Sequence, residues 1–524
     1  MTVHRMMHRV LLLAIAGGLL AGLPLSSGAA ALDVRVAPAA APTPPPGLPP
    51  FYAVPDPLPP GNPGDVIALE QETVSGLHGT LYRVMYHSRS LLGKDIAVTG
   101  LIAVPATPAP AVGYQVISWA HGTTGIADVC APSLDPSSYA GFANGLLDQG
   151  YLVTATDYEG LGTPGRHPYI VGESEARGVL DIVRAARNLP SLHASDRYLV
   201  WGHSQGGHAA MFSLHIAGQW APELHLVGVV AGAPPSQLLF LGQALQASPF
   251  RYYELMVAAG FNAAYGDAGA PLDQVLTPLG IQKLSLVDQG CAGTIAAGVQ
   301  GINFSDLQKA DPSTVPVWHD LLAANDPGQF TSASSEPLLI IQGGSDEQIP
   351  VISSQILFGQ LCTLGQGTQR WIYPGQSHAG VIAPSFNDML AWISDRFADK
   401  SAPSITPTGQ SDVQATACAS TVPPTTTTTT SAPTTTTTQA STTSTSTTTT
   451  SVAPAVVAST TTTSTAALAG SVTPSMVQVL GTQTTRSTLS FTGIDVEDSV
   501  TAGLFLLLVG LLVAGRARRP SSSR

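Results

Sequence analysis

The sequence of 524 residues predicts an α/β fold: a mostly parallel eight-stranded sheet, covered by helices on both faces, with one long helical insertion. Three observations support this class. Short strands that are apolar at almost every position alternate with stretches of helical spacing, which is typical of a parallel sheet buried on both sides. Two strands with a polar and apolar alternation precede them. One interval lacks the strand pattern altogether.

The strands can be assigned in chain order. The segments LHGTLYRVMYHS and DIAVTGLIAVPA alternate and predict an antiparallel pair at the start of the sheet. GESEARGVLDIVRAARNL has the spacing of an amphipathic helix. Six apolar segments supply the remaining strands, namely YQVISWAHG, YLVTATDYEGLG, DRYLVWGHS, HLVGVVAGAP, PLLIIQGG and RWIYPG.

Residues 237–336 separate two of these strands. A crossover between parallel strands needs far fewer residues. The interval is rich in Leu, Ala, Phe and Tyr, as in QLLFLGQALQASPFRYYELMVAAGFNAAY. We therefore expect a helical cap over the C-terminal edge of the sheet, with an unrelated small domain as the alternative.

The N-terminus has the features of an export signal. Arg5 and Arg9 precede an apolar run, and PLSSGAAALD then supplies small residues suited to cleavage. We expect residues 1–31 to be a signal peptide, with a membrane anchor as the alternative. Residues 32–50 form a Pro/Ala-rich arm, and residues 51–402 form the main folded domain.

The C-terminal part changes composition. Residues 403–488 are rich in Thr, Ser and Pro, cannot bury a core, and predict an extended stalk. In residues 489–524, LSFTG resembles the L-P-x-T-G sorting signal of wall-anchored bacterial proteins but has Ser490 in place of Pro. An apolar span and a basic tail follow. The segment predicts either cleavage between Thr492 and Gly493 with attachment to the cell wall, or an uncleaved membrane anchor.

Charge and cysteine content narrow the function. With 22 Lys and Arg against 34 Asp and Glu, the net charge of −12 argues against a nucleic acid partner. No metal site or dinucleotide loop is evident, so no cofactor is predicted. An oxidising compartment favours two disulfides among four scattered cysteines, and three pairings are open. The cysteines are Cys130, Cys291, Cys362 and Cys418.

Ser204 is the candidate nucleophile. It lies in YLVWGHSQGGHAAM, where an apolar strand meets the G-x-S-x-G pattern and a run of helix-tolerant residues follows. The pattern alone is weak, but a strand-to-helix turn lifts a serine hydroxyl out at the carboxyl edge of a sheet. The alternative is a tight turn with no chemistry.

A serine nucleophile needs a base, and on this kind of scaffold the chain order is Ser, acid, His. Asp346 follows the Gly-Gly turn after the strand PLLIIQGG, and its neighbour Glu347 is the rival acid. His378 follows the last strand and is the only His beyond Asp346. Ser204, Asp346 and His378 therefore form the predicted triad.

The oxyanion of the reaction needs fixed hydrogen-bond donors. We expect these to be the backbone N–H of Gln205, next after the nucleophile, and that of Thr123 in the turn after SWAHG. His121 is expected to be a turn or packing residue. His203 and His208 are expected to pack near the nucleophile rather than to bind metal.

Together these motifs resemble a known family. HGTTG, CAPS, DYEGLGTPGRHPY, GHSQGGHA, GGSDEQIP and GQSH are similar to motifs of the secretory lipase family of α/β-hydrolases, the fungal lipase A type. The resemblance covers about residues 51–399. It implies an α/β-hydrolase fold, lipase or esterase activity through the triad, and a lid over the acyl site. It also implies that Cys130 pairs with Cys291, clamping the cap to the core, and Cys362 with Cys418.

The sequence thus predicts an extracellular serine ester hydrolase that acts on lipid or other esters and is displayed at the cell surface. Three alternatives are open. A cell-envelope acyltransferase would use the same triad with an alcohol in place of water. A non-catalytic adhesin would explain the Thr-rich stalk. A peptidase could use the same fold and residues.

Overall fold

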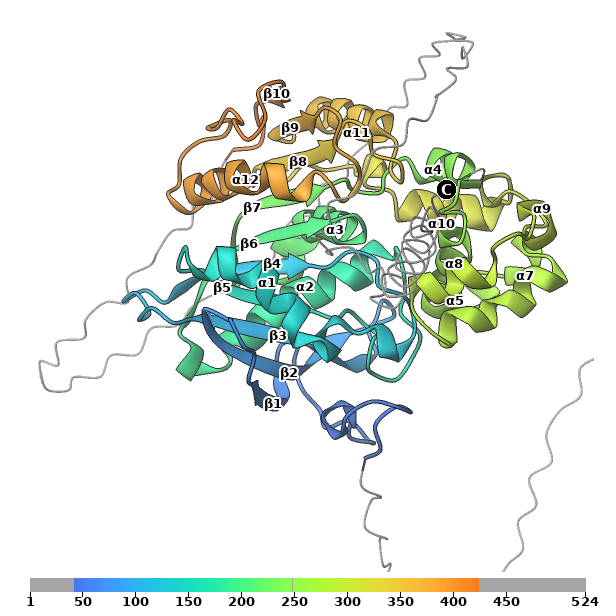
Figure 1. Ribbon diagram of the computed structural model, residues 1–524, viewed down its shortest axis with the longest axis horizontal. Helices are drawn as coiled ribbons and strands as arrows, with labels where there is room; N and C mark the ends of the chain where they lie inside the picture. The colour runs from blue at the N-terminus through green and yellow to red at the C-terminus, as the bar shows by residue number, and fades with distance from the viewer. Residues whose placement is uncertain (1–41, 247, 424–524) are drawn as a thin grey trace, which may run out of the picture. The chain divides into compact units, whose positions relative to one another are not determined.

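The computed structural model describes residues 42–246 and 248–423 (Figure 1). The predicted signal peptide, most of the Thr-rich stalk and the C-terminal sorting sequence lie outside the described residues. Among the helices of the described ranges, none is both long and apolar enough to cross a bilayer.

The described chain forms one sheet of ten strands in the order β1-β2-β3-β5-β4-β6-β7-β8-β9-β10. The six strands from β5 to β9 in this order pair in parallel. The pairs β1–β2, β2–β3, β3–β5 and β9–β10 are antiparallel. The bounds are β1 (Val66–Glu72), β2 (Gly79–Arg89), β3 (Asp95–Pro105), β4 (Tyr114–Ala120), β5 (Leu152–Thr156), β6 (Ala194–His203), β7 (His225–Gly232), β8 (Leu338–Gly343), β9 (Thr368–Tyr373) and β10 (Gln414–Cys418).

Helices cover both faces of this sheet (Figure 1). Side chains of α2 (Gly172–Arg187), α3 (Gln205–Trp220) and α11 (Val351–Leu364) join the apolar core on one face. Those of α1 (Pro136–Leu147) and α12 (Ile382–Phe397) join the core on the other. Because both faces are covered, all side chains of the strand β8 are buried, which explains its continuous apolar run. The predicted α/β class is confirmed.

The sheet has two strands more than the eight that the sequence predicts. The additional strands, β1 and β10, lie at the two edges. Most side chains of β10 are exposed, and those of β1 are at best half-buried. An edge strand with little burial has no apolar pattern to detect. Since β10 follows residue 402, the folded domain continues into the first part of the segment assigned to the stalk.

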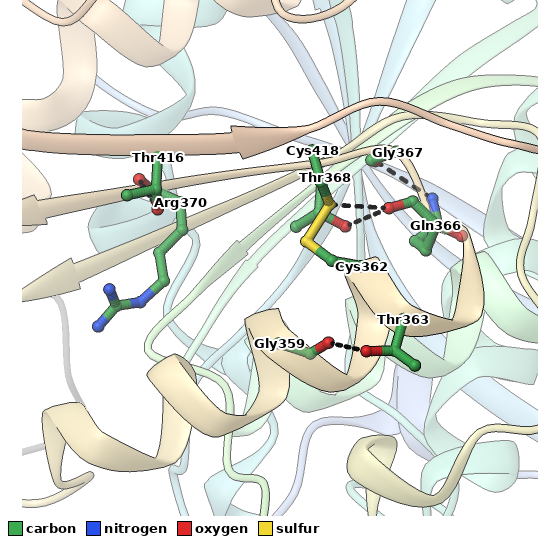
Figure 2. Close-up of a disulfide and its surroundings, with 9 residues drawn as sticks. All are labelled: Gly359, Cys362, Thr363, Gln366, Gly367, Thr368, Arg370, Thr416 and Cys418. Atoms are coloured by element: carbon green, nitrogen blue, oxygen red, sulfur yellow. Dashed lines mark hydrogen bonds between the residues drawn. A yellow bond between two sulfur atoms is a disulfide. The ribbon is translucent and has the colours of Figure 1, made fainter.

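A disulfide fastens this last edge strand. Cys362 near the end of α11 is bonded to Cys418 at the end of β10 (Figure 2). Beyond it, the N–H of Thr421 donates to the carbonyl oxygen of Gly365 at 3.0 Å. The chain is therefore held to the domain up to the residues just before the Thr-rich tract.

Residues 237–336, which we call the cap, are mainly helical, with an apolar core that includes Phe261 and Trp318. The disulfide Cys130–Cys291 ties the cap to the loop after β4. Both disulfides are the pairs that the resemblance implies. The cap helices are α4 (Leu238–Gln246), α5 (Tyr253–Gly269), α6 (Leu272–Val275), α7 (Pro278–Lys283), α8 (Ala292–Gly298), α9 (Phe304–Leu307) and α10 (Pro316–Ala324). Short 3₁₀ turns are η1 (Pro50–Tyr52), η2 (Asp128–Cys130), η3 (Pro132–Leu134), η4 (Pro190–Leu192), η5 (Leu284–Asp288), η6 (Pro312–Thr314) and η7 (Pro327–Gln329).

Candidate active site

Ser204 occupies a sharp turn between the strand β6 and the helix α3. Its φ of 61° and ψ of −123° form a strained conformation for a residue other than glycine, at a cost of about 1–3 kcal/mol. The turn is held by two hydrogen bonds, from the N–H of Ser204 to the carbonyl of Gly232 at 2.9 Å and from the N–H of His208 to the carbonyl of Ser204 at 3.0 Å. The strain therefore persists because the surroundings enforce it.

The two glycines that flank Ser204 are required by packing. A Cβ on Gly202 would lie 2.0 Å from the carbonyl oxygen of Gly206. A Cβ on Gly206 would lie 1.9 Å from the carbonyl oxygen of Ala120, at the end of the neighbouring strand β4. Both obstacles are backbone atoms that cannot rotate away. The G-x-S-x-G pattern thus lets strand and helix approach closely enough to form the turn.

His378 and Asp346 lie together in loops after adjacent strands. The Nδ1 atom of His378 lies 2.9 Å from Oδ2 and 3.0 Å from Oδ1 of Asp346. An ionised carboxylate only accepts hydrogen bonds, so Nδ1 carries a proton, and in the neutral imidazole Nε2 is then an acceptor. His378 is 1% exposed, and its Nε2 has no hydrogen-bond partner among the described residues. In the neutral imidazole, Nε2 therefore has a lone pair that no described residue uses.

The surroundings of Asp346 favour the ionised form of its carboxyl group. Burial by itself raises the pKa of its carboxyl, but the hydrogen bond and charge of His378 and the N–H groups of Ile349 and Gln348 outweigh it and lower the pKa. The rival acid Glu347 has a different place: its Oε2 accepts the main-chain N–H of His378 at 3.0 Å. Asp346 therefore contacts the imidazole, and Glu347 holds the loop that carries it.

The turn after β4 lies against the nucleophile turn. A Cβ on Gly122 would lie 3.8 Å from the Cβ of Ser204. The next residue, Thr123, is buried, and its hydroxyl lies 2.9 Å from the hydroxyl of Tyr169. The N–H groups of Thr123 and Gln205 take no part in the backbone hydrogen bonds between described residues. As far as the described residues go, both amides are available as donors on segments that adjoin Ser204.

A buried polar network lies behind the nucleophile turn, and the sequence analysis did not predict it. Its centre is Glu175 of α2, which is fully buried. Glu175 Oε1 accepts from the side-chain amide of Gln205 at 2.9 Å, and Oε2 lies 2.9 Å from Nδ1 of His208. The Gln205 amide also lies 2.7 Å from Nε2 of His167, and burial lowers the pKa of that imidazole to about 4. His167 is therefore neutral and accepts.

The other histidines near Ser204 have structural surroundings. His121 is buried and hydrogen-bonds the carbonyls of Gly122 and Asp157. The ring of His203 lies 4.7 Å from that of His378, and burial, reinforced by the charge of His378, lowers the pKa of His203 to about 3. Within residues 42–246 and 248–423, no group of His, Cys, Asp and Glu is placed to hold a metal ion.

A cavity lies in the cap and is lined mostly by apolar side chains of α4, α5 and α10. Two contacts connect its wall to the candidate site. The hydroxyl of Tyr253, a wall residue, lies 2.9 Å from Oε1 of Gln348, in the loop of Asp346. The ring of Tyr253 also stacks on Tyr169, whose hydroxyl contacts Thr123.

The fold is that of an α/β-hydrolase. X-ray structures of Candida antarctica lipase A have this fold: the closed state aligns with a TM-score of 0.59 and 23% identity, covering 69% of this chain and 88% of that one. An esterase from Xanthomonas oryzae aligns with a TM-score of 0.54 and 17% identity, over 65% of this chain and 99% of that one. At these identities the likeness concerns the fold.

Residues 140–404 match the secretory lipase family, so the chain belongs to that family. A secreted triacylglycerol lipase, LIP4 of Malassezia globosa, is 28% identical over 62% of this chain and 73% of its own length. A probable inactive lipase of Mycobacterium tuberculosis is 24% identical over 61% of this chain and 74% of its own length. Family and fold together make the chain an exported lipase or esterase, which confirms the predicted enzyme class.

Proposed function

We propose that the protein hydrolyses long-chain carboxylic esters through a Ser204–Asp346–His378 triad and an acyl-enzyme. The observation that carries the proposal is the bond of His378 Nδ1 to both oxygens of Asp346, while its buried Nε2 has no partner in the part of the chain that the structure describes. His203 also has a buried Nε2 without a partner among the described residues, but it is His378 whose Nδ1 is bonded to a carboxylate. The lone pair of His378 Nε2, together with the strained turn at Ser204, supports a role for His378 as the general base.

The proposed reaction has two halves. His378 Nε2 takes the proton of the Ser204 hydroxyl as its oxygen attacks the ester carbonyl, and Asp346 stabilises the resulting imidazolium. The N–H groups of Thr123 and Gln205 hold the oxyanion, and His378 then protonates the leaving alcohol. Water then attacks the acyl carbon as His378 Nε2 takes its proton, and His378 returns that proton to the Ser204 oxygen as the bond to the acyl group breaks and the acid leaves. No cofactor enters either half.

The cap cavity is the proposed acyl site. Its wall is apolar, and Tyr253 and Tyr169 connect it to the turn of Thr123. Each CH₂ group moved from water into such a cavity contributes about 0.8 kcal/mol. The value of kcat/KM should therefore rise with acyl length until the cavity is full.

The test uses p-nitrophenyl esters from acetate to palmitate with wild type, Ser204→Ala and Ser213→Ala. Ser213 is a matched control, because it is a buried serine of the helix α3 that follows Ser204, and its hydroxyl bonds the carbonyl of Ala209. Ser204→Ala should lose about 10⁶ in rate, as a serine protease does, while Ser213→Ala retains activity. Turnover by folded Ser204→Ala, or rejection of butyrate and longer esters, would overturn the proposal.

A non-catalytic surface protein is the second candidate, favoured by the Thr-rich tract and by the relative described as probably inactive. A fluorophosphonate probe reacts with an activated serine and separates the two. Labelling of wild type but not of Ser204→Ala supports the hydrolase. Absence of labelling on folded wild type supports the non-catalytic role. Product analysis with an added alcohol distinguishes hydrolysis from acyl transfer.

The proposal includes surface display. It is supported by the sequence alone, through the Thr-rich tract, LSFTG and the following apolar and basic segments. We favour cleavage between Thr492 and Gly493 with covalent attachment to the wall over an uncleaved anchor. Mass spectrometry of the C-terminal peptide tests this. A chain that ends at Arg524 in the membrane fraction excludes sorting, and enzyme found only in the medium excludes both modes of attachment.

A further inference from the structure

The cap cavity contains a carboxyl group in mainly apolar surroundings. Glu254, in the first turn of α5, lines the cavity together with leucines of α4, Val257 and Trp318. The Oε1 atom of Glu254 is buried and has no hydrogen-bond partner within the described part of the chain. A buried polar atom without a partner costs stability, and such atoms in native proteins commonly have a functional reason.

Space beside this carboxyl is kept open by the facing helix. A Cβ on Gly242 of α4 would lie 3.2 Å from Glu254 Oε1, so the absent side chain leaves the oxygen uncovered. Gly242 has no positive φ that would require glycine. The absence of a side chain at Gly242 therefore keeps open the space in the cavity beside Glu254.

The ionisation of Glu254 also suits a hydrogen-bonding role. Burial, with a smaller contribution from the negative charge of Asp311, raises the pKa of Glu254 to about 8. Asp311 is the other acidic residue of the wall, and its Oδ2 accepts from the amide of Gln243 at 3.1 Å. At neutral pH the Glu254 carboxyl is therefore protonated, and it both donates and accepts.

We propose that Glu254 is a specificity residue that hydrogen-bonds a hydroxyl group on the acyl chain, so that the cavity prefers hydroxylated long-chain acyl groups to plain ones. The inference rests on the proposed function, because it assigns a substrate class to the same acyl site. A site built to hydrogen-bond a substrate hydroxyl discriminates strongly against the analogue that lacks it. A plain chain would leave the carboxyl buried and unpaired.

The experiment compares p-nitrophenyl stearate with a positional series of p-nitrophenyl hydroxystearates. In wild type, at least one hydroxyl position should raise kcat/KM by about tenfold or more over stearate. Glu254→Leu should reduce this ratio to within about twofold of one, mainly by improving stearate. Gly242→Val, which covers Oε1, should reduce it as well. Glu254→Gln keeps a donor and an acceptor and should retain the preference.

Asp320→Leu is the matched control, since Asp320 is an acidic cap residue whose side chain is 84% exposed and outside the cavity wall. It should retain the wild-type ratio. If wild type cleaves butyrate and stearate but no hydroxystearate is preferred, or if Glu254→Leu keeps the preference, the inference is overturned and the proposed function stands. If folded wild type cleaves no ester at all, both the proposed function and this inference are refuted.

Discussion

Replacing Asp346 with Ala should reduce kcat far more than replacing its neighbour Glu347 with Ala. Asp346 accepts the Nδ1 proton of His378 at 2.9 and 3.0 Å in a site where its side chain is 0% exposed. Loss of the acid from the triad of a serine protease lowers kcat by about 10⁴. Glu347 accepts a hydrogen bond from the main-chain N–H of His378 at 3.0 Å.

A hydrogen bond to a charged group contributes about 1.5–3 kcal/mol, so Glu347→Ala should lower kcat by about 10- to 150-fold at most. We therefore expect Asp346→Ala to be slower than Glu347→Ala by about two orders of magnitude or more. The assay is the initial rate of p-nitrophenyl butyrate hydrolysis at saturation, with near-UV circular dichroism to confirm that both variants fold. A larger loss in Glu347→Ala would make Glu347 the third triad member and refute the reasoning.

Three further predictions concern the scaffold. Gly202→Ala should abolish activity and lower the melting temperature in thermal unfolding, because its Cβ would lie 2.0 Å from the Gly206 carbonyl oxygen; a variant with wild-type values would contradict this. Replacing Cys130 and Cys291 together with Ser should lower the free energy of unfolding by about 5 kcal/mol on the chain-entropy account of a loop of 161 residues, measured in urea. The folded-state pKa of Glu254, about 8, exceeds the ordinary value of 4.5 for a glutamate, so the native state holds an extra proton between these values and loses stability as pH rises through them. Glu254→Gln should therefore gain stability relative to wild type across this window, by at most about 1.4 kcal/mol per pH unit, and a constant difference would count against burial of the neutral acid.

The parts of the site that the sequence predicts are those with a local signature. Ser204 lies between a strand and a helix with glycines at fixed offsets, and its strained turn is the structural counterpart of that pattern. Asp346 and His378 follow strand ends, where an α/β sheet gathers functional groups. The edge strands β1 and β10 have no such signature, because exposed strands lack the apolar run that burial imposes on β8.

Glu175 could not be predicted for a different reason. It occupies an ordinary position in the helical pattern of α2, and its importance depends on partners brought together only by folding. The carboxylate joins Gln205 and His208 of the nucleophile helix, and His208 Nε2 donates to the carbonyl oxygen of Asn325 in the cap at 2.7 Å. Asn325 Oδ1 in turn accepts the N–H of Gly172 at the start of α2. The nucleophile turn and the cap therefore share one buried polar network. Such polar contacts fix the relative position of two segments more strictly than apolar packing does, because a displacement leaves buried polar groups unpaired. The carboxylate of Glu175 orients the side chain of Gln205 beside the nucleophile, and through His208 it also helps to fix the position of the cap and of the proposed acyl cavity.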